Sequence, residues 1–123
     1  MRMRRKITLA GVAGVLGTAA TLFAASPAQA ASSRCLVGSS GNCTTSIIAA
    51  NASGHFVDLF VDNTFRPSPC PWRVRDVNNR QIVRSGTVAT NSRTDQIVQG
   101  VYGFYQLELR GCSISAEGHL DNT

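Results

Sequence analysis

From residue 31 to its end, the sequence consists of short stretches in which apolar and polar residues alternate. Glycine, asparagine, serine and proline separate these stretches, and no segment repeats its apolar residues at helical spacing over three turns. Alternation with a period of two is typical of strands that bury one face. We expect about seven strands, at 45–49, 55–62, 72–77, 80–87, 96–101, 104–110 and 114–120. The pattern predicts an all-β fold, a small antiparallel two-sheet sandwich.

The number of strands and the turn residues between them resemble the outline of an immunoglobulin-like sandwich. In such a fold the residues of one parity in each strand face the opposite sheet and form the core. The residues expected there are Val57, Leu59, Val61, Trp72, Val74, Val83, Ile97, Tyr105, Leu107, Leu109, Ile114 and Leu120.

The segment Gly100–Tyr105 is similar to the Gly-x-Tyr entry into a late strand of many sandwiches. In those folds a tyrosine hydroxyl holds the preceding loop. The resemblance covers six residues and implies this local arrangement only.

The N-terminus has the organisation of a bacterial secretory signal peptide. Three arginines and a lysine precede an apolar run from Ile7 to about Ala25, and Ala28-Gln29-Ala30 supplies small residues at a cleavage site. We therefore expect residues 1–30 to be removed, and residues 31–123 to form a single secreted domain that is not attached to a membrane.

The high isoelectric point belongs to the expected signal peptide. Four of the twelve basic residues lie in the first six positions, so residues 31–123 hold eight arginines against seven acidic residues. Their formal charge is +1. This balance argues against a strongly basic nucleic-acid-binding domain, and the length argues against a multidomain enzyme.

All four cysteines lie in the expected secreted domain. An even number of cysteines in a small exported chain predicts disulfides. Three pairings are possible, and we favour Cys35–Cys43 with Cys70–Cys112, because the first closes a segment rich in turn formers and the second joins the ends of two predicted strands. No closely spaced cysteine or histidine pair suggests zinc, and neither a metal nor a cofactor is expected.

The candidate binding surface is a set of arginines on a predicted hairpin. If Asn78-Asn79 forms a two-residue turn, Arg73 lies opposite Arg84, and one face carries Arg73, Arg75, Arg80 and Arg84. Such a face would suit an anionic cell-wall polymer or an acidic protein. The alternative is a solvated strand face whose charge is neutralised by Asp58 and Asp62 on a neighbouring strand.

A second candidate surface is the segment from Arg66 to Trp72, which contains three prolines and Cys70. A rigid loop loses little entropy on binding, so this segment could serve a secreted protease inhibitor or a toxin-like antagonist. Four aromatic residues could instead form a platform for sugars, although a loop could equally cover the outward ones. They are Phe56, Phe60, Phe65 and Tyr102.

Evidence for catalysis or ion binding is weaker. The two histidines, His55 and His119, lie outside the usual catalytic motifs. The possible carboxylate pairs are Asp58 with Asp62 and Glu108 with Glu117, and calcium could use the oxygens of 62–64 or 76–79. A small extracellular enzyme is therefore the third hypothesis. The leading one is a secreted, disulfide-stabilised binding protein without catalysis, whose ligand and oligomeric state the sequence leaves open.

Overall fold

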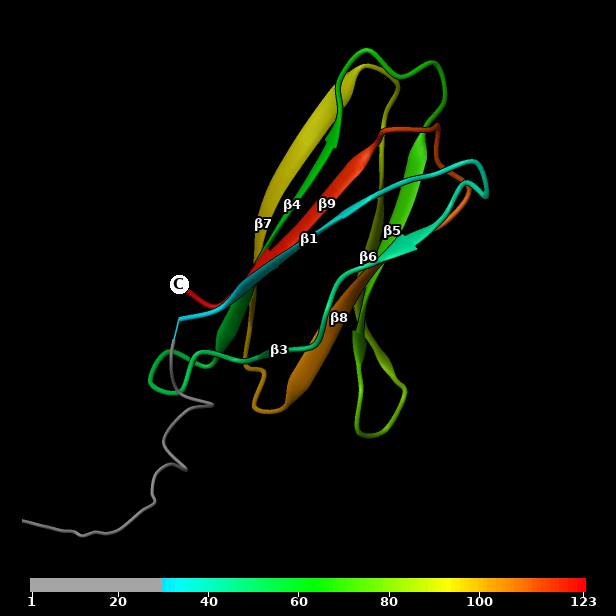
Figure 1. Cartoon of the computed structure of the whole chain (residues 1–123). Coiled ribbons are helices and arrows are strands. Elements are labelled where there is room, and N and C mark those ends of the chain that lie inside the picture. Colours follow the sequence, from blue (N-terminus) through cyan, green and yellow to red (C-terminus); the bar gives the residue numbers. More distant parts are fainter. Residues whose placement is uncertain (1–29) are drawn as a thin grey trace, which may run out of the picture.

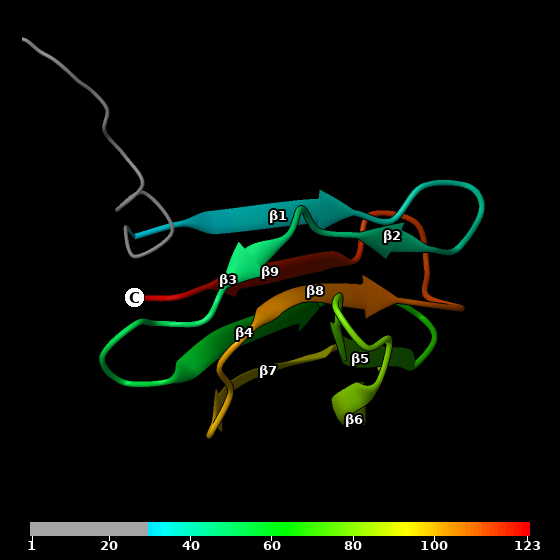
Figure 2. The same cartoon turned by 90° about the horizontal axis from the view of Figure 1, so that it is seen from below.

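Two antiparallel β-sheets pack face to face in the computed structural model, which describes residues 30–123 (Figures 1 and 2). One sheet has the order β1 (Ser32–Leu36), β9 (Glu117–Asp121), β4 (Phe56–Asn63), β7 (Ser92–Gln99). The other has the order β2 (Cys43–Thr44), β8 (Phe104–Leu109), β5 (Cys70–Asp76), β6 (Ile82–Val88), and β3 (Ile48–Ala49) also pairs with β8. The predicted all-β, two-sheet sandwich is confirmed. The predicted signal peptide, apart from its last residue, lies outside the described residues.

The central strands form where the sequence alternates most regularly. In β4, Val57, Leu59 and Val61 are buried, while the residues between them are partly exposed. β8 buries Tyr105, Leu107 and Leu109 in the same way. Period-two burial places these side chains between the two sheets, where they form the core.

Nine of the twelve predicted core residues are buried. Val83, Ile97 and Ile114 are instead 37%, 52% and 60% exposed. Val83 lies at a β-bulge in the edge strand β6, Ile97 faces outward beside the buried Val98, and Ile114 precedes β9. Several core residues were missing from the prediction: Val37, Ile48, Val88, Val98, Val101 and Ala116.

The strand boundaries differ from the prediction mainly near the N-terminus. The strand expected at 45–49 is replaced by the two short strands β2 and β3, and β1 was not predicted. β7 begins at Ser92, four residues earlier than expected, and β9 begins at Glu117, three residues later. The described chain therefore contains nine strands where about seven were expected.

Both predicted disulfides are present. Cys35–Cys43 joins β1 to β2, and it therefore connects the two sheets. Cys70–Cys112 joins the start of β5 to the residues that follow β8, its neighbour in the same sheet. The bridge that crosses between the sheets is thus the shorter one, whereas immunoglobulin domains use a long bridge for this purpose.

The hydroxyl group of Tyr105 holds the loop that precedes β8. The backbone N–H groups of Tyr102 and Gly103 both donate to Tyr105 Oη, at 3.1 Å each. This arrangement confirms the prediction made from the Gly100–Tyr105 segment.

Candidate functional site

Arg73 and Arg75 extend from the outer surface of the five-stranded sheet. They alternate in β5 with Trp72 and Val74, which are buried in the core. The register of β5 with β8 places Arg73 opposite Glu108. The prediction that these two arginines share an outward face is therefore confirmed.

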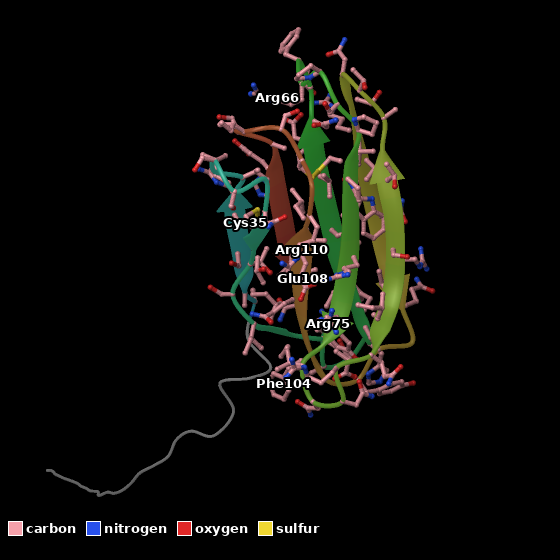
Figure 3. All side chains as sticks on the ribbon, turned by 90° about the vertical axis from the view of Figure 1, so that its right-hand side faces the viewer. Cys35, Arg66, Arg75, Phe104, Glu108 and Arg110 are labelled. Atoms are coloured by element: carbon pink, nitrogen blue, oxygen red, sulfur yellow. A yellow bond between two sulfur atoms is a disulfide. The ribbon has the colours of Figure 1, made fainter. Side chains whose placement is uncertain are left out.

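Glu108 is the carboxylate around which the arginines gather, and only 5% of its surface is exposed. Arg73 Nε donates to Glu108 Oε1 at 2.6 Å, and Arg75 Nε donates to Oε2 at 2.9 Å. Arg110 Nη2 lies 3.6 Å from Oε1. Three guanidinium groups thus surround one carboxylate, which leaves an excess of two positive charges. Figure 3 labels Glu108 together with two of these arginines, Arg75 and Arg110.

The protonation state of Glu108 follows from these contacts. Burial alone raises the pKa of a carboxyl group, but the hydrogen bonds and charges of Arg75 and Arg73 hold the pKa of Glu108 below its usual range. Glu108 is therefore ionised at neutral pH. It positions Arg73 and Arg75 on the sheet and neutralises one of the three nearby cations.

The partner predicted for these arginines was wrong. Asp58 and Asp62 belong to β4 in the other sheet, where they pair with β7 and β9. Glu108 comes from β8, about 35 residues beyond Arg73 in the chain. Alternation in β8 placed Glu108 outward, but nothing in the sequence indicated that β8 lies beside β5.

The predicted two-residue turn is also wrong. The N–H of Asp76 donates to Gln81 O, so residues 77–80 form a four-residue turn in which Arg80 has a φ of 68°. Asp76 Oδ1 and Asn79 Oδ1 each accept a backbone N–H within this turn. These two side-chain oxygens, which were considered as calcium ligands, therefore stabilise the turn by accepting backbone hydrogen bonds.

Arg84 does not share the face of Arg73 and Arg75. Beyond the turn, Arg75 pairs with Ile82 as predicted, but Val74 pairs with Arg84, because the bulge leaves Val83 as an extra residue. Arg84 therefore lies on the side of Val74, and its Nη1 donates to Gln96 Oε1 in β7 at 3.2 Å. Arg80 lies in the turn, where its carbonyl oxygen accepts a 2.7 Å hydrogen bond from Arg75 Nη1.

Two adjoining hollows lie on this side of the sheet and share Glu108 and Arg110. The first, of about 490 Å³, is lined by Pro71, Trp72, Arg73, Ile82, Ser85, Gly86, Glu108 and Arg110. The second, of about 350 Å³, is lined by Arg75, Val77, Arg80, Gln106, Glu108 and Arg110. We call this surface the basic face and define it by Arg73, Arg75, Arg80, Glu108 and Arg110. It combines guanidinium donors with an apolar floor.

The proline-rich segment is partly a strand, because β5 begins at Cys70 and includes Pro71. The loop before it is fixed by Asn63, whose amide Nδ2 donates to Ser68 O at 2.8 Å. Phe65 is 84% exposed in this loop and has a φ of 61°. This positive φ places the Phe65 backbone in the left-handed region.

The four aromatic residues considered as a sugar platform do not form one surface. Phe56 and Phe60 are half-buried on β4, and the Phe60 ring lies 5.5 Å from that of His119. Tyr102 stacks on His55 with ring centroids 4.4 Å apart. Phe65 lies beyond the opposite end of β4 from Phe56.

The outer surface of the four-stranded sheet is acidic. Alternation in β4, β7 and β9 places five of the seven carboxylates of residues 31–123 there. We call this surface the acidic face and define it by Asp58, Asp62, Asp95, Glu117 and Asp121. Glu108 and Glu117 thus lie on opposite outer surfaces of the sandwich and cannot form the carboxylate pair considered for glycoside hydrolysis.

Asp58 is the most perturbed group of the acidic face. Burial raises the pKa of Asp58 to about 6, and the nearby carboxyl groups of Asp95 and Asp121 act in the same direction. Asp62 has a lowered pKa, because its side chain accepts hydrogen bonds from Thr64. Asp62 Oδ1, one of the oxygens considered as a calcium ligand, thus accepts the backbone N–H of Thr64.

Replacing Asp58 with asparagine should stabilise the protein at neutral pH. The ordinary pKa of Asp58 is 3.8, and its folded-state value is about 6. Ionisation therefore destabilises the native state progressively as the pH rises from about 4 to about 6. Asp58→Asn should raise the free energy of unfolding by about 1 kcal/mol at pH 7.5, after allowance for solvent screening, and by almost nothing near pH 4. Urea unfolding of the wild type and the variant at several pH values measures the difference. An equal gain in stability near pH 4 and at pH 7.5 would contradict the prediction.

No protein family, curated protein or solved structure matches this chain. Within residues 30–123, no helix is long and apolar enough to span a membrane. The same residues contain no group of three or more histidine, cysteine, aspartate or glutamate side chains arranged to hold a metal ion.

Proposed function

We propose that this chain is a small extracellular binding protein whose basic face holds an anionic ligand. The observation that carries the proposal is the arrangement of Arg73, Arg75 and Arg110 around Glu108. One carboxylate cannot neutralise three guanidinium groups, and about half of the Arg110 side chain is exposed. Two disulfides in a small β-domain support an extracellular setting, since such bridges persist in oxidising compartments.

The shape of the basic face favours an anion that carries an apolar or sugar-like group beside its charge. The larger hollow is lined by Pro71, Trp72 and Ile82 as well as by arginines. Ligand sites commonly combine an apolar surface with a few polar groups that fix orientation. Arginine donors suit carboxylate and phosphate oxygens, so a phosphate- or carboxylate-bearing wall polymer fits this surface.

The proposal is tested by replacing Arg110 with glutamine and measuring the binding of two soluble polyanions, polyphosphate and polyglutamate, with dextran as the uncharged control. Arg110 makes only a long contact with Glu108, so its loss should leave the fold intact. Affinity for the polyanion should fall about 5- to 10-fold, since one charge-assisted contact contributes roughly 1–1.5 kcal/mol. Binding by the wild type should also weaken as salt rises.

Arg84→Gln is the matched control, because it removes the same charge from a side chain outside the basic face. The proposal fails if Arg110→Gln and Arg84→Gln bind equally well, or if dextran binds as tightly as the polyanions. Parallel assays of protease inhibition with the same samples test the alternative function.

A further inference from the structure

The charges of residues 31–123 are separated onto opposite sides of the sandwich. The acidic face carries five carboxylates, offset on the same surface by Arg34 and Arg93. The basic face carries four arginines and one carboxylate. The net charges, with histidine neutral, are therefore −3 and +3, in a domain whose formal charge is +1. Because the inner surfaces of the two sheets pack against each other, the two outer faces point in opposite directions (Figure 1).

The acidic face also has features of a contact surface. Its carboxylates are interspersed with apolar side chains, among which Ile97 and Leu36 are about half exposed. The register of β4, β7 and β9 brings Asp58 opposite both Ile97 and Asp121. A partner with guanidinium donors would neutralise the carboxylates, and the apolar side chains would pack against it.

We propose that the acidic face of one copy of this chain docks on the basic face of a second copy. Charge complementarity carries this proposal, because the acidic face has an excess of carboxylates and the basic face has an excess of guanidinium groups. Arg80 and Arg110 are the exposed arginines of the basic face and would meet the carboxylates of the neighbouring copy. The contact uses two different surfaces, so every added copy leaves one face of each kind free. The sandwiches would therefore stack in an open chain.

The dimensions of the faces predict weak association. The four strands of the acidic face are spaced about 4.8 Å apart and have five or eight residues each, so at about 3.3 Å per residue they give a flat area of roughly 400 Å². This is well below the roughly 800 Å² that each partner buries in a standard stable interface. The interaction should therefore depend on protein concentration and be suppressed by salt, because screening removes most of the attraction between exposed charges.

A complementation experiment with two double variants tests the proposal. Arg80→Gln with Arg110→Gln weakens the basic face, and Asp95→Asn with Asp121→Asn weakens the acidic face. The control, Arg66→Gln with Arg84→Gln, makes the same charge change as the basic-face variant but outside both faces. All proteins are expressed from the full-length sequence and studied by sedimentation velocity over a concentration series, at about 20 mM and about 500 mM salt.

In low salt, the average mass of the wild type and of the control should rise at least twofold with concentration, and high salt should reverse the rise. Each face variant alone should remain monomeric. Their mixture should form a dimer and nothing larger, because each variant retains one of the two faces. The proposal is overturned if the wild type is monomeric throughout, if a face variant associates as the wild type does, or if the mixture stays monomeric.

This result can be separated from the outcome of the polyanion experiment. The acidic-face variant keeps an intact basic face, so it should bind polyphosphate at least as well as the wild type. If the wild type self-associates but does not bind polyphosphate, the proposed function alone is overturned. If the wild type binds polyphosphate but stays monomeric, the stacking proposal alone is overturned.

Discussion

Removing the disulfide between Cys70 and Cys112 should lower the free energy of unfolding by about 4 kcal/mol, as estimated for a loop of this length. The two cysteines are 42 positions apart. In the unfolded chain the bridge therefore restrains a long segment, which includes β5, β6, β7 and β8. The change to make is Cys70→Ala with Cys112→Ala, because Cys70 is fully buried and serine would place a hydroxyl group in the core. Urea unfolding of the oxidised wild type and of the double variant measures the loss.

The matched control removes the other bridge by Cys35→Ala with Cys43→Ala. These cysteines are eight positions apart, and the same chain-entropy estimate gives about 2.6 kcal/mol. The longer bridge should therefore have the larger effect, although it joins strands within one sheet. The opposite order would show that attaching β1 to the second sheet stabilises the fold more than restraining the long loop does.

The sequence predicted the centre of the fold because burial there follows the local pattern. Residues 56–63 alternate strictly, and the corresponding strand β4 lies in the middle of its sheet. The edge of the fold gave no such signal. Residues 32–36 include two serines and an arginine, and β1 forms through backbone pairing with β9 and the Cys35–Cys43 bridge. Local alternation contains no information about such pairing.

The candidate site was predicted in part for a related reason. Alternation within β5 correctly placed Arg73 and Arg75 on one outward face. Identifying Glu108 and Arg110 as their neighbours required the pairing of β5 with β8, which are distant in sequence. Arg84 was misplaced because one extra residue in a strand transfers every later side chain to the other face.

Replacing Trp72 with alanine should cost about 3–5 kcal/mol of unfolding free energy, the range for truncating a buried tryptophan. Only 3% of Trp72 is exposed, and the residue belongs to the continuous core between the sheets. Gly86 on β6 faces its ring so closely that a Cβ at that position would lie 2.7 Å from Trp72 Cζ2. The site is shaped around the indole, and alanine would leave a cavity that the paired strands β5 and β6 cannot close.

Ile97→Ala is the control, because the sequence-based prediction and the structure differ in where they place Ile97. The prediction placed both Trp72 and Ile97 in the core, but Ile97 is 52% exposed on the outer surface of β7. Its truncation should change the free energy of unfolding by less than about 0.5 kcal/mol, as is usual for surface positions. Chemical denaturation of both variants gives the comparison. A cost for Ile97→Ala close to that for Trp72→Ala would mean that β7 pairs with β4 one residue out of register, since such a shift turns Ile97 inward and Val98 outward.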